Sequence, residues 1–199
     1  GEGVPLKGYM AFIGEAAVEE IGYGRTVEAN WNVSAGEDFY ITGRVTGTFT
    51  NASDPEKPTA GERKLGFAAW EKDKWENYWA QDADTSGVKG GIKDGNDGVA
   101  GLEWQGGSWP WTALPEGGQD AYKNGELIFG FGRIDGNFFI CAGTSEENMA
   151  FSILQTAGGK LSDKNLVIGK WCNDSYVRGA LADVMFYTGE DVPVELPSA

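Results

Sequence analysis

The chain has 199 residues, enough for one large β domain or two small ones, and a chain of this size can bury a core without metal ions or many disulfides. Its 30 acidic and 16 basic residues give a formal net charge of −14, which argues against nucleic acid and anionic membrane surfaces as partners, because both attract clustered lysine and arginine. The absence of histidine excludes Ser-His and Cys-His nucleophile pairs and leaves paired carboxylates, or lysine and tyrosine, as candidate catalytic groups.

Short strands separated by turns are predicted along most of the chain. Runs rich in β-branched and aromatic residues predict strands over residues 6–13, 39–49, 65–70, 126–131, 137–142, 150–154, 166–171 and 180–187. Glycines within 39–49 suggest a bulge or bend, and the polar segment 50–63 is typical of a surface loop. Asn124-Gly125 predicts a turn, and Asp135-Gly136 predicts a hairpin between two neighbouring strands.

These elements, with 31 glycines and no long amphipathic helix, predict an all-β fold. We expect a single β-sandwich or jelly roll with an elaborated tryptophan-rich loop region, forming one domain over residues 1–191. Residues 192–199 (VPVELPSA) are typical of the start of a linker or tail. No apolar run reaches the roughly 18 residues of a membrane-spanning helix. Cys141 and Cys172 are the only cysteines, and either a disulfide in an oxidising compartment or two buried thiols would fit their apolar surroundings.

Six of the 8 tryptophans fall between residues 70 and 111, in the stretch with the weakest core pattern. Their flat indole rings are suited to stacking on the apolar faces of sugars. The first group consists of Trp70, Trp75, Asn77, Tyr78, Trp79 and Gln81. A strand would place Trp75, Asn77, Trp79 and Gln81 on one face, whereas a helical turn would group Trp75, Tyr78 and Trp79. Either arrangement gathers aromatic rings among charges that prevent all of them from joining a core.

The second group consists of Trp104, Gln105, Trp109 and Trp111 in a Gly/Pro-rich segment that we expect to be a binding loop. The competing interpretation for each tryptophan is that it closes the core or anchors a loop. Between the two groups lie two acidic turns with Asp82, Asp84, Asp94, Asn96 and Asp97. Lys93 at the twelfth position excludes an EF-hand, but a looser structural Ca²⁺ site remains possible beside ordinary turn chemistry.

The strand-rich pattern, the aromatic segment 70–79, the segment 104–111 and the closing strand 182–187 (ADVMFY) together carry a resemblance. The chain resembles the β-sandwich carbohydrate-binding modules of bacterial plant-polysaccharide-degrading enzymes and cellulosome components. That resemblance implies non-catalytic polysaccharide binding within a larger secreted protein, often with a structural calcium and with no cofactor required. A β-glucan such as cellulose or xyloglucan is the first choice of ligand, and starch or a hemicellulose is the next.

Two other function classes remain open. A jelly-roll glycoside hydrolase could use two carboxylates, with Glu76, Glu103, Asp82 and Asp94 as candidates, although the Glu-x-Asp-x-x-Glu signature of laminarinase-like enzymes is absent. A protein–protein adhesion or scaffold module would also use exposed tryptophans, because they are frequent interface hot spots. We expect a binding protein rather than an enzyme.

Overall fold

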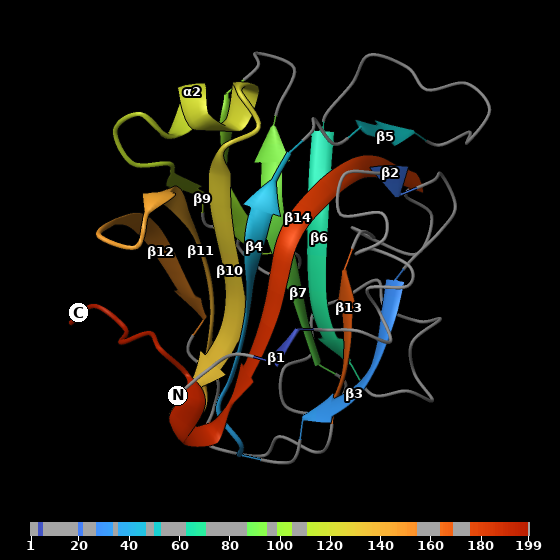
Figure 1. Cartoon of the computed structure of the whole chain (residues 1–199), viewed down its shortest axis with the longest axis vertical. Helices are drawn as coiled ribbons and strands as arrows, with labels where there is room; N and C mark the ends of the chain where they lie inside the picture. Colours follow the sequence, from blue (N-terminus) through green and yellow to red (C-terminus); the bar gives the residue numbers. More distant parts are fainter. Residues whose placement is uncertain are drawn as a thin grey trace.

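The computed structural model describes residues 4–5, 20–21, 27–33, 36–46, 50–52, 63–70, 87–94, 99–104, 111–154, 164–168 and 176–198. Over these residues the protein is all-β, with its strands in two antiparallel sheets and one short α-helix, α2 (Gly118–Lys123). A 3₁₀ turn, η2 (Gly189–Asp191), follows the last strand at the opposite end of the molecule from α2 (Figure 1). No helix in the described part of the chain has the length and apolar character needed to cross a membrane.

The larger sheet has eight strands. Its main path runs β1 (Val4–Pro5), β14 (Tyr176–Thr188), β4 (Phe39–Val45), β10 (Leu127–Ile134), β11 (Asn137–Ser145) and β12 (Asn148–Leu154). The short strands β2 (Glu20–Ile21) and β5 (Thr50–Ala52) also pair with β14. A bulge lies in β14, where the register shifts between Ala182 and Met185 and Asp183 adopts a φ of 56°. The pairing of β4 with β10 is regular over residues 39–45, and residues 47–49 of the segment expected to hold a bulge or bend lie outside the described residues.

The second sheet has six strands. Their order is β3 (Val27–Val33), β13 (Lys164–Ile168), β6 (Arg63–Trp70), β7 (Gly87–Asp94), β8 (Ala100–Trp104) and β9 (Trp111–Ala113). In Figure 1, β14 of the eight-stranded sheet passes in front of β6 of this sheet, and the two sheets are stacked as layers.

One hydrophobic core fills the space between the sheets. Alternate residues of β4, β10 and β11 point inward, including Phe39, Phe129 and Phe138, and they join Leu102 and Trp104 of β8 in a single buried cluster. Each of these side chains is at most 1% exposed. This period of two is what a sheet with one face on a core requires, and it fixes the register of every strand that contributes to it.

The Asp135-Gly136 hairpin prediction is confirmed. Strands β10 and β11 pair from Ile128–Gly143 to Ile134–Asn137, and only Asp135 and Gly136 lie between them. Both residues have positive φ, 49° and 80°, as a two-residue type I′ turn requires. The Asp135 amide also donates to the Asp38 carboxylate at 3.0 Å, which ties the turn to the residue preceding β4.

Several other predicted strands appear with shifted ends, and three in the tryptophan-rich middle were not predicted. Strands β6, β10, β11, β12, β13 and β14 cover most of the segments expected from apolar runs, whereas residues 6–13 lie outside the described residues. Segment 50–63, expected to be a loop, begins with β5 and ends with the first residue of β6. Strands β7, β8 and β9 lie where we expected loops. Three glycines in the eight residues of β7 hide its alternation, and β8 and β9 are only five and three residues long.

Part of the C-terminal segment, which we expect to be the start of a linker or tail, packs against the eight-stranded sheet. Val192, Val194 and Leu196 are partly buried and pack against a second cluster on the other face of the eight-stranded sheet. The fully buried members of this cluster are Tyr40, Phe139 and Cys141. This part of segment 192–199 therefore belongs to the folded body.

Cys141 is a free thiol, and Cys172 lies outside the described residues. Burial raises the pKa of the Cys141 thiol to about 12. The thiolate, which is the reactive form, is therefore scarce at pH 8. In a Cys172→Ser background we expect Ellman's reagent to find no thiol in the native protein at pH 8 and one thiol in guanidinium chloride. Rapid native-state reaction, or an unsubstituted chain that shows no thiol when denatured without reductant, would contradict this assignment.

Candidate functional site

The structure describes only part of the predicted sugar site. Trp70 ends β6, paired with Gly87, but its side chain is not among those described. The predicted binding residues that lie outside the described residues altogether are Trp75, Asn77, Tyr78, Trp79, Gln81, Gln105 and Trp109. Their proposed role stays a prediction.

The structure likewise describes little of the predicted calcium site. Asp94 ends β7 opposite Ala100, and its side chain is not described, while Asp82, Asp84, Asn96 and Asp97 lie outside the described residues. Within the described ranges, no three acidic, cysteine or histidine side chains gather closely enough to hold a metal ion. The calcium site therefore stays a prediction.

Trp104 has a different place from the one expected. It is the last residue of β8, its side chain is 1% exposed, and it belongs to the core between the sheets. Its indole Nε1 donates to Ser152 Oγ of β12 at 3.0 Å, so the one polar atom of the ring is bonded across the core. Alternation explains this placement, since Ala100, Leu102 and Trp104 are two apart and all point inward. Trp104 therefore does not present its ring to an external ligand, and we remove it from the site.

Trp111 is the tryptophan that the structure places at the surface. It begins β9, an edge strand, and 45% of it is exposed. Its ring lies over Gly101 of β8: a Cβ added to Gly101 would come within 2.3 Å of the ring atom Cζ2 and 2.5 Å of Cε2. Glycine is therefore needed beneath the ring. The indole is supported by backbone on one side while nearly half of its surface stays open to solvent.

Trp111 has a charged neighbourhood on the same face. Glu103 is its direct partner across the β8–β9 ladder and is 6% exposed. The Glu103 Oε2 atom lies 3.4 Å from Nζ of Lys93, which sits opposite Gly101 on β7. Gly91 is the partner of Glu103 on β7, and both Gly91 and Gly101 are buried. We call Trp111, Gly101, Glu103, Lys93 and Gly91 the tryptophan face.

Helix α2 holds β8 in place next to this face. The Gln119 amide group pairs with the backbone of Ala100: Nε2 donates to the Ala100 carbonyl at 2.7 Å, and Oε1 accepts from the Ala100 amide at 2.9 Å. Ala121 and Tyr122 of the same helix are buried in the core. The strand that carries Gly101 and Glu103 is thus bonded at its first residue as well as along its ladders.

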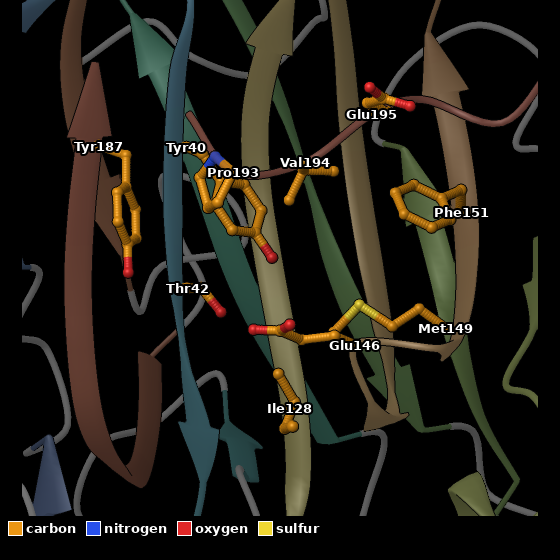
Figure 2. Close-up of a pocket in the computed structure, with 10 residues that line it drawn as sticks. All are labelled: Tyr40, Thr42, Ile128, Glu146, Met149, Phe151, Tyr187, Pro193, Val194 and Glu195. Carbon is orange, nitrogen blue, oxygen red and sulfur yellow. The ribbon is translucent and has the colours of Figure 1, made fainter. Parts of the chain in front are cut away.

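A second feature, on the opposite side of the molecule, was not predicted. A pocket of about 260 Å³ lies on the outer face of the eight-stranded sheet, the face turned away from the core (Figure 2). Tyr40 and Thr42 of β4 and Ile128 of β10 form its floor, and Met149 and Phe151 of β12 form one side. We call it the C-terminal pocket, because the chain end crosses it.

The remaining lining residues come from three other segments. Tyr187 of β14 stands on the side opposite β12, and Glu146 comes from the turn between β11 and β12. Pro193, Val194 and Glu195 of the C-terminal segment complete the lining. In Figure 2 the Glu146 carboxylate extends over the sheet toward the hydroxyl groups of Tyr40 and Thr42.

No family model matches this sequence, and no curated protein matches it significantly. Among solved structures, a functionally unknown protein from Saccharomyces cerevisiae is 13% identical with a TM-score of 0.44, over 85% of this chain and 75% of that one. A legume lectin-like domain from Entamoeba histolytica is 11% identical with a TM-score of 0.47, over 81% and 77%. The scytalido-glutamic peptidase is 9% identical with a TM-score of 0.37, over 80% and 73%. At such values these similarities assign no function to this chain.

Proposed function

We propose that the protein binds a polysaccharide without cleaving it, and that the tryptophan face is part of the binding surface. The observation that supports this most is Trp111, a large indole with 45% of its surface exposed and its ring held over Gly101. A rigid aromatic ring supplies contact area for a sugar at little entropic cost, because few rotatable bonds must be fixed on binding. The facing sheets are compatible with the expected β-sandwich or jelly roll, which we include in the proposal.

The tryptophan face presents one exposed indole beside a partly exposed ammonium group. It lies on the outer face of the six-stranded sheet at the edge strand β9, where Trp111 is exposed and Gly101 and Glu103 are buried. Because Gly101 has no side chain, the indole packs directly against β8, and its exposed part is available to stack on a pyranose ring. Lys93, a fifth of whose side chain is exposed, provides an ammonium group that can donate to sugar hydroxyls beside the ring.

One carboxylate of this face supports the proposal of binding without cleavage. Glycoside hydrolysis needs two carboxyl groups at a defined separation on either side of the scissile bond. Of the four carboxylates considered as candidates, Glu103 is the one whose side chain the structure describes, and it is buried against Lys93. A carboxylate held in an ion pair beneath the surface supports the face and is poorly placed to protonate a glycosidic oxygen.

The test is retardation in native gels that contain hydroxyethylcellulose, xyloglucan, soluble starch or xylan. We expect one β-glucan to retard the unsubstituted protein and Trp111→Ala to lose about tenfold or more in affinity, as truncation of a hot-spot tryptophan does. Trp111→Phe should retain part of the retardation because a smaller aromatic face remains. Ile153→Ala is the matched control, since Ile153 is also an exposed hydrophobic residue but lies on β12.

Two results would count against the proposal. Retardation by none of the four polysaccharides, or equal retardation of Trp111→Ala and the unsubstituted protein, would remove the tryptophan face from glycan binding. Release of reducing sugars from any polysaccharide in the same panel would show an enzyme instead of a binding module. Thermal melting of each variant is needed beside the gels, so that lost binding is not confused with unfolding.

A further inference from the structure

We propose that the C-terminal pocket is a separate binding site for a small organic cation, an ammonium group with apolar substituents. The pocket lies on the eight-stranded sheet and shares no residue with the tryptophan face. Its volume of about 260 Å³ is just under the usual range for sites that hold drug-sized ligands, so its occupant is a small molecule. The C-terminal segment crosses it in Figure 2 and contributes Pro193, Val194 and Glu195 to its lining.

The floor of the pocket is rigid before any ligand binds. Tyr40 is 4% exposed, its ring stacks on Phe139 at 5.8 Å with an interplanar angle of 18°, and its hydroxyl lies 3.8 Å from Cys141 Sγ. Gly130 lies beneath the ring, and a Cβ there would meet the Tyr40 hydroxyl at 2.5 Å and Cys141 Sγ at 2.6 Å. A ring fixed in this way keeps one orientation, so little conformational entropy is lost when a ligand contacts it.

The lining has the composition that recognises cations. Aromatic rings from Tyr40, Tyr187 and Phe151 offer π-faces, and a cation within about 6 Å of such a face is attracted to the ring quadrupole. Met149 adds a polarisable thioether among them. Burial, first of all, raises the pKa of the Tyr40 phenol well above its ordinary value, with the nearby thiol of Cys141 acting in the same direction. The ring therefore stays neutral over the physiological range.

The charged residues that line the pocket favour a positively charged ligand. Glu146 and Glu195 contribute two carboxylates, whereas none of the ten lining residues is a lysine or arginine. Arg44 lies two residues along β4 from Thr42 but does not line the pocket. Its guanidinium pairs with the Asp183 carboxylate at 3.2 Å and donates to the Gly125 carbonyl at 3.2 Å. Anionic ligands would meet like charge, whereas a cation is attracted by both exposed carboxylates and a neutral sugar gains no such attraction. An ammonium ligand satisfies the carboxylates and the rings together.

The C-terminal segment is part of the site because it supplies one of the two carboxylates. Val192, Val194 and Leu196 pack on the sheet cluster, and the residue between the last two, Glu195, lines the pocket. The carboxylates thus come from two places far apart in sequence, the β11–β12 turn and the chain end. Removing either charge leaves the aromatic floor unchanged, which makes the charge contribution measurable separately.

The test is isothermal titration of the full chain with choline and, in parallel, with 3,3-dimethylbutan-1-ol, a neutral molecule of the same shape. We expect choline to bind and the neutral alcohol not to bind measurably. Glu146→Gln and Glu195→Gln should each weaken choline binding by about two- to fivefold, as for single exposed ion pairs, and the double variant should weaken it more. Glu190→Gln, a charge removal on η2 outside the lining, is the matched control and should bind like the unsubstituted protein.

Three results would overturn the proposal: equal binding of choline and the alcohol, binding of neither, or choline binding that the double variant leaves unchanged. Titration with glucose forms a further arm, and glucose binding that Glu146→Gln abolishes in the absence of choline binding would make the pocket a sugar site instead. The outcome is independent of the polysaccharide proposal, because Trp111→Ala should leave choline binding unchanged and Glu146→Gln should leave gel retardation unchanged.

Discussion

Replacing Trp104 with alanine is expected to lower the free energy of unfolding by about 3–5 kcal/mol, the range for truncating a large aromatic residue in a core. The side chain is 1% exposed and lies among residues from both sheets. Gly90, its direct partner on β7, is so close that an added Cβ would lie 2.7 Å from the ring atom Cε3. With the ring removed, no neighbour at Gly90 can fill the space, so the cavity persists.

Chemical denaturation measures this loss, and two further variants divide it. Ser152→Ala removes the acceptor of the Trp104 Nε1 hydrogen bond and should cost about 1–3 kcal/mol, because a buried donor is left unpaired. Trp111→Ala should cost less than Trp104→Ala, because its side chain is nearly half exposed. If Trp104→Ala kept its stability and lost gel retardation, Trp104 would be a ligand-binding residue and its burial in the core would be refuted.

The contrast between Trp104 and Trp111 shows which features of the site could be predicted from the sequence and which could not. Both lie in one segment rich in glycine and proline, seven positions apart, and the sequence pattern treats them alike. Whether each ring points into the core or outward depends on the pairing of β8 with β7 and β9, which joins residues through backbone hydrogen bonds that no local pattern specifies. The all-β fold class could be predicted from the sequence because apolar alternation and turn residues act locally, as at Asp135-Gly136.

The C-terminal pocket could not be predicted from the sequence for a related reason. Its lining comes from β4, β10, β12, β14, the β11–β12 turn and the chain end, and these residues become neighbours only through the strand order of the eight-stranded sheet. One signal was present in the sequence: the apolar alternation Val192, Val194 and Leu196 in a segment interpreted as a linker. Such a period of two predicts a segment with one buried side, and this side packs on the sheet.

Replacing Arg133 with alanine is expected to cost about 3 kcal/mol or more of unfolding free energy, although arginine seldom occupies a fully buried position. Arg133 is 0% exposed on β10 and donates from Nε and Nη2 to the Glu37 carbonyl, at 2.9 and 2.6 Å. Its guanidinium carbon lies 5.6 Å from the centre of the Phe39 ring and 5.5 Å from that of Phe138. The side chain therefore fixes the residues before β4 to β10 and fills the end of the core.

The methionine variant Arg133→Met separates these two contributions. Methionine retains most of the apolar volume beside Phe39 and Phe138 but donates no hydrogen bond, so its loss should be about 1–3 kcal/mol from the unpaired Glu37 carbonyl. The difference between the alanine and methionine variants then measures packing alone. Urea denaturation at two ionic strengths is the measurement, and the cost of Arg133→Ala should be nearly independent of salt because buried groups are weakly screened. Equal stability of Arg133→Ala and the unsubstituted protein would mean that the buried guanidinium is replaceable by water, and that the segment before β4 is held by the Asp38–Asp135 contact without it.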